Sequence, residues 1–197
     1  MKKLSAFAML MLLLLAIPAR PQGAQTKEQS PRTVVEEFWK LEIEGGRLTA
    51  EGQQRANTFF VRPIPIPLTK EVVVIDRDFS VWDPIINGNG AQVMIGVRSL
   101  GGIDSSLHYL PPDGSAVKEG VGYHLLLSDK HWEFGGDGKT LKEVIGVPEW
   151  RIDRTGTKIF LTVDAARRYI TQARDKTADP LIRRNADRAL AALNRDQ

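Results

Sequence analysis

The chain has 197 residues, of which 27 are basic and 24 acidic, and it contains no cysteine. The absence of cysteine excludes disulfide bonds, thiol chemistry and lipid attachment through an N-terminal cysteine. A chain of this length is sufficient for one domain that is stabilised by burial alone.

The first 24 residues have the layout of a secretory signal. Lys2 and Lys3 precede an uncharged apolar run over residues 4–18, and a small residue stands at Ala24. This run has 15 residues, whereas a membrane-spanning helix needs roughly 20. We therefore expect residues 1–24 to be a cleaved signal peptide, and the mature protein to be periplasmic or extracellular without a membrane anchor. An uncleaved anchor is the alternative.

Charge is unevenly spread along the expected mature chain. Without Lys2, Lys3 and Arg20, 24 basic residues remain against 24 acidic ones. Residues 25–149 carry 13 basic and 18 acidic side chains, and residues 150–197 carry 11 and 6. Such asymmetry can mark a nucleic-acid surface. A basic helical tail that covers an acidic body explains it equally well, so we expect no nucleic-acid partner.

Two helices are predicted at the start of the folded region. Ser30–Pro31 is an N-cap and first-turn pair, and Gly45–Gly46 ends the first helix. A second helix is predicted over Thr49–Phe60, before the prolines of residues 63–67 impose an extended segment. The apolar stripe of the first helix is Val34, Val35, Phe38, Trp39 and Leu41.

From residue 71 the hydrophobic period changes to two, which predicts strands. Residues 71–82 begin with the run VVVI and are expected to be buried on both faces at first. Residues 87–90 form a hairpin turn into a strand whose inner face carries Val93, Ile95 and Val97. Gly101–Gly102 is expected to break or bulge that strand, which resumes over residues 103–110.

The clearest strand covers residues 117–128. Its dry face carries Val121, Tyr123, Leu125 and Leu127, and its mixed face carries Gly122, His124, Leu126 and Ser128. Residues 129–147 are expected to be rich in turns, with the short strand EWRID after them. Thr162 then caps a helix, and Asp179–Pro180 starts a last helix.

Helices, then hairpin-connected strands, then helices predict an α+β fold rather than the βαβ alternation of a parallel sheet. Glycines inside the strands allow a sheet to bend. We expect a cone-like, strongly curved antiparallel sheet packed on the N-terminal helices, with extra C-terminal helices. The strand glycines are Gly96, Gly101, Gly102 and Gly122.

The opening SPRTVVEEFWKLEIEGGRLT and the closing EWRIDRTGTKIFLTVDAARRYI, in this order of elements, resemble the nuclear transport factor 2-like superfamily, in particular its exported bacterial members of unknown function. The resemblance covers Ser30 to Ala173 and implies a cone with a cavity at its wide end. Its enzymes include steroid isomerases, dehydratases and epoxide hydrolases, which use no metal or organic cofactor. Other members only bind or dimerise. The helix from Asp179 departs from the common pattern.

The expected organisation follows from these elements. Residues 1–24 are the signal peptide and residues 25–30 a flexible leader. Residues 31–176 form the nuclear transport factor 2-like domain, and residues 177–197 a C-terminal helix extension. No internal repeat is present.

The candidate catalytic residues are His124, Asp76 and Asp78. Asp76 and Asp78 are two residues apart on a strand and share a face. Two close carboxylates can act as acid and base, and a histidine can move a proton near neutral pH. A solvated strand end and a structural histidine are the competing interpretations. Asp104, Ser106 and His108 would form a second, weaker constellation on one strand face.

The candidate ligand-binding residues are Trp82, Tyr123, His124 and Trp132, which we expect to line a cavity. The histidine and carboxylates around Trp132 lack the spacing of zinc or calcium sites, so we expect no metal and no cofactor. The preferred function is a module that binds a small hydrophobic molecule or forms a homodimer. The alternative is a cofactor-independent isomerase, dehydratase or hydrolase.

Overall fold

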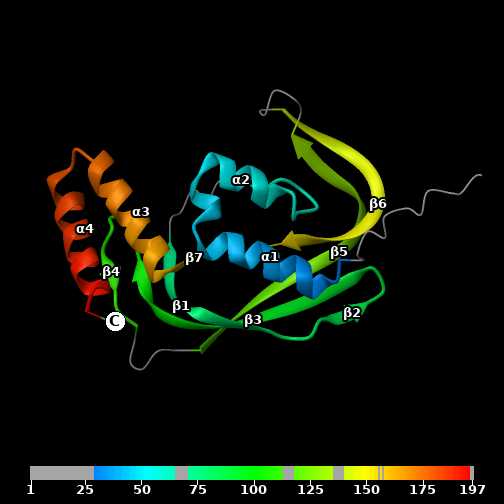
Figure 1. The fold of residues 1–197 in the computed structure, drawn as a ribbon, viewed down its shortest axis with the longest axis horizontal. Coiled ribbons are helices and arrows are strands. Elements are labelled where there is room, and N and C mark those ends of the chain that lie inside the picture. Colours follow the sequence, from blue (N-terminus) through cyan, green and yellow to red (C-terminus); the bar gives the residue numbers. More distant parts are fainter. Residues whose placement is uncertain are drawn as a thin grey trace, which may run out of the picture.

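The computed structural model describes residues 29–64, 71–112, 118–134, 140–154, 156 and 158–195. The expected signal peptide, and the leader up to residue 28, lie outside the described residues. Helices come first in this part of the chain, then strands, then helices again, so the predicted α+β class is confirmed (Figure 1).

Each α-helix starts at a side-chain cap that the sequence predicted. The caps are Ser30, Thr49, Thr162 and Asp179. The helices are α1 (Pro31–Ile43), the 3-10 helix η1 (Gly46–Leu48), α2 (Ala50–Asn57), α3 (Val163–Lys176) and α4 (Pro180–Leu193). The strands are β1 (Val72–Val81), β2 (Ile85–Asn87), β3 (Gly90–Ile103), β4 (Tyr109–Leu110), β5 (Lys118–Phe134), β6 (Leu141–Arg154) and β7 (Ile159–Thr162).

The strands form one mixed sheet in the order β6-β5-β3-β1-β7, with β2 and β4 also paired to β3. All pairs are antiparallel except β1 with β7, where Val72 lies opposite Ile159 in a parallel ladder. The sheet, expected to be antiparallel, is therefore mixed because of this one edge pair. A buried four-residue strand has no alternation or hairpin turn from which its direction can be read.

The sheet is strongly curled, and α1 and α2 lie within its curve (Figure 1). Phe38 and Trp39 of α1 are fully buried and meet Tyr123 of β5, with ring centroids 5.8 Å and 6.3 Å apart. Trp39 also packs on Phe160 of β7 at 5.1 Å. The expectation that the N-terminal helices fill the concave side is confirmed.

A second core lies on the opposite face of β1 and β7. Val72 and Val74 pack there with Ile170 of α3 and Leu193 of α4, while Val73 faces the α1 core. This confirms that the VVVI run is buried on both faces. The C-terminal helix α4 is therefore part of the same packed body as the sheet.

Three local predictions were wrong. The second helix ends at Asn57, because Phe60 instead forms a parallel bridge to Ile152 at the edge of β6. The predicted bulge at Gly101, whose φ of 142° favours glycine, is confirmed, but the strand ends at Ile103 and does not resume over residues 103–110, of which only Tyr109–Leu110 form β4. The turn after it is closed by Asp104, whose Oδ1 accepts hydrogen bonds from two backbone N–H groups.

The third difference concerns residues 129–147, where turns were predicted. β5 runs on to Phe134 and β6 already begins at Leu141, and ten pairs of residues join the two strands. Cross-strand pairing over this length stabilises strands whose residues have weak strand propensity. Of the predicted turn, residues 135–139 lie outside the described residues.

A buried ion pair joins α1, η1 and β7. The Arg47 guanidinium donates from Nε to Glu42 Oε2 and from Nη2 to Glu42 Oε1, both at 2.6 Å, and also to the Lys158 carbonyl. Glu42 Oε1 accepts the Phe160 N–H as well. Burial alone would lower the pKa of Arg47, but the hydrogen bonds and charge of Glu42 outweigh it and raise the pKa.

We predict that Arg47→Met lowers the free energy of unfolding by roughly 3–5 kcal/mol, because it leaves the Glu42 carboxylate buried without its partner. Urea unfolding followed by circular dichroism measures this. The double variant Glu42→Leu with Arg47→Met should recover much of the loss, because it removes both charges. The control Glu36→Gln, in the exposed pair with Arg32, should change stability little. Equal stability of Arg47→Met and the parent would contradict the prediction.

Candidate functional site

Two open grooves lie on the outer face of the sheet, the face opposite α1. On β3 and β5, outward residues such as Gln92 and His124 alternate with the buried core residues Val93, Tyr123 and Leu125. The larger groove has a volume of about 640 Å³ and the smaller about 550 Å³. Both volumes are in the range of small-molecule sites, roughly 300–1,000 Å³.

The larger groove, here named the Trp82 groove, crosses β1, β3 and β5. Its lining contains both predicted carboxylates, Asp76 and Asp78, together with Trp82. The structure therefore brings these three sequence-predicted residues together. The remaining lining residues are Phe79, Ser80, Gly96, Val97, Arg98, Lys118, Glu119 and Gly120.

Glycines leave the floor of the Trp82 groove without side chains. Gly96 of β3 and Gly120 of β5 are directly opposite each other. A Cβ at Gly96 would lie 2.8 Å from Ser80 Oγ and 3.5 Å from Trp82 Nε1, so the indole packs against bare backbone. Trp82 is nevertheless 57% exposed. An exposed aromatic surface thus stands beside Gly96, and the Met94 side chain lies against Gly120.

The charged groups of the Trp82 groove have both signs. The Asp76 carboxylate and the Arg98 guanidinium are 3.8 Å apart, and both side chains are about half exposed. Asp78 and Glu119 add negative charge, and Lys118 adds positive charge. Because water screens such exposed charges, they affect the orientation and the selection of a bound molecule more than its binding free energy.

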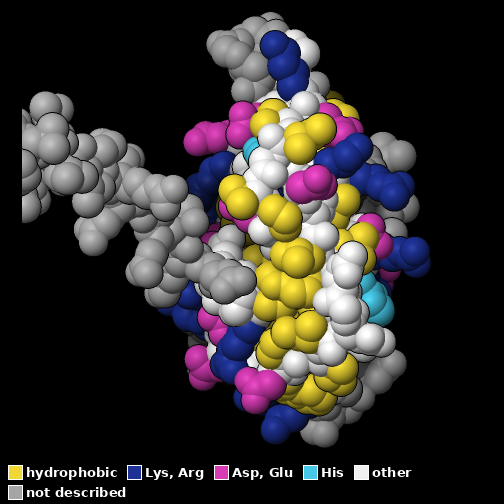
Figure 2. All heavy atoms as spheres, turned by 90° about the vertical axis from the view of Figure 1, so that its right-hand side faces the viewer, with side chains coloured by type: hydrophobic (Ala, Val, Ile, Leu, Met, Phe, Trp, Pro, Cys, Tyr) yellow, Lys and Arg dark blue, Asp and Glu magenta, His cyan; other side chains and the backbone are white. Residues whose placement is uncertain are grey.

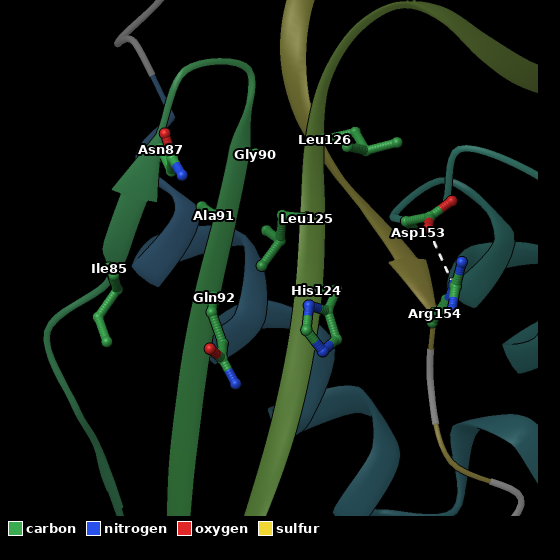
Figure 3. A pocket seen from close by; sticks show the side chains of 10 residues that line it. All are labelled: Ile85, Asn87, Gly90, Ala91, Gln92, His124, Leu125, Leu126, Asp153 and Arg154. Carbon is green, nitrogen blue, oxygen red and sulfur yellow. Dashed lines mark ion pairs between the residues drawn. The ribbon is translucent and has the colours of Figure 1, made fainter.

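The smaller groove, here named the His124 groove, lies between the β2–β3 hairpin and the end of β6 (Figure 3). His124 stands on β5 opposite Gln92 and Arg154. Asp153 forms an ion pair with Arg154 at 3.3 Å, drawn as the dashed line in Figure 3. Ile85 and Leu126 are its exposed apolar residues.

The structure does not bring His124 together with Asp76 or Asp78. His124 is opposite Gln92 of β3. The β1 segment that holds the two aspartates runs from Ile75 to Phe79 and is opposite residues 97–99 of β3. Five to seven residues along β3 correspond to roughly 17–23 Å. This distance is far beyond hydrogen-bond reach, so the predicted histidine–carboxylate pair does not form.

Tyr123 and Trp132 do not line either groove. Tyr123 is 2% exposed and belongs to the α1 core. Trp132 donates its Nε1–H to the Val61 carbonyl at 3.1 Å and so holds the segment that follows α2 against β5. Of the predicted ligand-binding residues, Trp82 and His124 line grooves, and each lines a different one.

Sequence reasoning did not single out Gly120, Arg98 and Lys118 as groove residues. The signal that could have found them is their outward register beside Gly96 on paired strands. This signal depends on which residues of β3 and β5 face each other. The alternation of polar and apolar residues within either strand does not fix that register.

Asp104 and His108 are close, but they close a turn instead of sharing a strand face. The Asp104 carboxylate accepts hydrogen bonds from the Ser106 and His108 N–H groups at 2.8 Å and 2.9 Å, and its Oδ2 lies 3.1 Å from His108 Nδ1. Partial burial would raise the pKa of Asp104, but these hydrogen bonds outweigh it and lower the pKa. The pair stabilises the link between β3 and β4.

We predict that Asp104 makes the fold more stable at neutral pH than in acid. Because its pKa is lower in the folded chain than the ordinary value of about 3.9, its contribution is present above that value and is lost as pH falls through the folded pKa. Unfolding of the parent and of Asp104→Asn, measured at pH 7 and pH 3, should show a stability difference that shrinks in acid. A difference that stays constant or grows in acid would be the contrary result.

Clusters of metal-ligand side chains and membrane-spanning helices are not found among the described residues. The His131 ring and Glu133 pair at 2.9 Å, but no three potential ligand side chains in the described part gather as a metal would require. None of the helices described there has the length and apolar character needed to cross a membrane. Comparison with protein-family models, curated proteins and solved structures finds no match.

Proposed function

We propose that the protein is an exported binding module of the nuclear transport factor 2-like type, which holds a small, largely apolar molecule in the Trp82 groove. The observation that carries the proposal is the position of the exposed Trp82 indole beside the floor of Gly96 and Gly120, against which Ser80 and Met94 also pack. The order of elements and the curled sheet around α1 support the family assignment.

The groove has the general properties of a small-molecule site. A flat molecule can stack on the indole and lie on the main chain of β3 and β5, since aromatic side chains contribute large apolar contact areas. A few polar groups at the rim can then fix its orientation. Asp76 and Arg98 stand at suitable positions for this.

Binding is favoured over catalysis by the separation of the candidate catalytic groups. The alternative of a cofactor-independent isomerase, dehydratase or hydrolase needs a carboxylate beside His124, and Asp76 and Asp78 lie in the other groove. The carboxylate that shares the groove with His124 is Asp153, and it is paired with Arg154. Among the described residues, His124 therefore has neither Asp76 nor Asp78 within reach as a proton partner.

We predict that the neutral fluorescent probe N-phenyl-1-naphthylamine binds the parent protein saturably. Trp82→Ala should weaken this binding roughly tenfold or more, because it removes the aromatic wall. Gly120→Val should also weaken it, because the new side chain fills the floor beside Met94. A fluorescence titration measures all three affinities.

Two matched controls accompany this titration. Leu110→Ala removes another half-exposed apolar side chain, 54% exposed and outside the groove, and should leave probe affinity unchanged. Ile145→Glu changes an exposed apolar residue on β6 and should also leave it unchanged. If Trp82→Ala binds the probe as tightly as Leu110→Ala does, the Trp82 groove is not the binding site.

A further inference from the structure

We infer that the Trp82 groove and the His124 groove are two parts of one trough, which holds an elongated amphipathic molecule with a single carboxylate. The inference rests on the proposed binding in the Trp82 groove and names the class of ligand. Both grooves lie on the outer face of the sheet, over the paired strands β3 and β5. Long-chain carboxylates such as palmitate are ligands of this class.

Five pairs of outward residues form the floor of the trough. Every second residue of β3 from Gly90 to Arg98 faces outward and is directly opposite an outward residue of β5. In order along β3, the pairs are Gly90 with Leu126, Gln92 with His124, Met94 with Gly122, Gly96 with Gly120, and Arg98 with Lys118. The first two pairs belong to the His124 groove and the last two to the Trp82 groove. The grooves are thus in line, and one pair of residues separates them.

The pair that separates the grooves, Met94 with Gly122, is apolar and adaptable. The Met94 side chain lies along β5, because a Cβ at Gly122 would be 3.1 Å from Met94 Sδ and one at Gly120 would be 3.2 Å from Met94 Cε. The Trp82 N–H donates to the Met94 carbonyl at 2.9 Å, so Trp82 lies next to this pair across the sheet. A methionine side chain is unbranched and flexible, and it adapts to irregular apolar surfaces. The separating pair therefore continues the apolar floor from one groove to the next.

The end of the trough at Arg98 and Lys118 favours an anion. Like charges directly opposite each other destabilise a sheet. The Asp76 carboxylate is 3.8 Å from the Arg98 guanidinium, and in the described part of the chain Lys118 forms no ion pair. A carboxylate placed between the two cations relieves their repulsion. The acidic lining residues Asp76, Asp78 and Glu119 disfavour a head group with more than one negative charge, such as a phosphate.

The other end of the trough supplies further apolar contacts. Figure 3 shows Gln92 and His124 side by side, and beyond them Gly90 has no side chain. The exposed fractions of Ile85 and Leu126 in this groove are 71% and 40%. Figure 2 faces the side of the molecule where the β2–β3 hairpin lies in Figure 1, and it shows hydrophobic side chains gathered there. An apolar chain that passes the separating pair therefore meets apolar surface again.

The length of the trough favours long chains. Counted along β3 from Arg98, Met94 is four residues away and Gln92 is six, which correspond to roughly 14 Å and 20 Å. An extended laurate is roughly 14 Å long and an extended palmitate roughly 19 Å, given a carbon–carbon bond of about 1.5 Å. Laurate therefore ends within the Trp82 groove, whereas palmitate reaches the pair of Gln92 and His124.

Isothermal titration calorimetry of the parent protein with laurate and with palmitate tests the inference. Palmitate should bind at least tenfold more tightly than laurate, because each additional buried methylene contributes up to about fourfold. Lys118→Gln should weaken the binding of both by roughly fivefold, because both place their carboxylate at the same end. Equal affinities of laurate and palmitate for the parent would overturn the inference.

The decisive variant is His124→Asp, which puts a carboxylate beside the chain end of palmitate. It should remove most of the gain of palmitate over laurate and leave laurate affinity unchanged, because laurate does not reach this residue. Gln92→Asp provides a second variant should circular dichroism show that His124→Asp does not fold. The matched control Leu181→Asp puts the same charge on α4, outside both grooves, and should retain the gain.

The proposed site and the trough fail on different results. Binding of N-phenyl-1-naphthylamine that is absent, or that Trp82→Ala does not weaken, counts against the Trp82 groove and therefore also against the trough. Probe binding that depends on Trp82, together with equal affinities for laurate and palmitate, counts against the trough alone. A palmitate affinity that neither His124→Asp nor Gln92→Asp lowers does so as well.

Discussion

The architecture depends on the buried pair of Glu42 and Arg47. Both side chains are almost completely excluded from water. Glu42 also accepts a hydrogen bond from the Phe160 N–H, and Arg47 donates one to the Lys158 carbonyl. Separating buried charges costs far more than breaking an exposed pair. The end of α1 and the η1 turn are therefore held to β7, although more than a hundred residues separate β7 from both in sequence.

This constraint explains why the concave side of the sheet is packed. With its C-terminal end held at β7, α1 directs Phe38 and Trp39 onto Tyr123 and Phe160. The rings fill the curve of the sheet, and the residues that the sequence suggested for a concave cavity are either buried there or turned outward. The grooves described for binding consequently lie on the outer face of the sheet.

The outer face carries two grooves with different physical character. In the Trp82 groove, glycines expose main chain beside one aromatic ring, which suits a small flat molecule. In the His124 groove, an imidazole and the Asp153–Arg154 ion pair stand beside the exposed Ile85 and Leu126.

The sequence by itself determined the helix starts, the double burial of β1 and the α+β class. Those features depend on local caps and on periodicity, which are readable within one element. Only the tertiary structure decided that β7 is parallel to β1 and that residues 130–134 pair with residues 141–145. It also separated His124 from Asp76 and Asp78, because strand register depends on contacts between distant segments and not on the pattern of either strand.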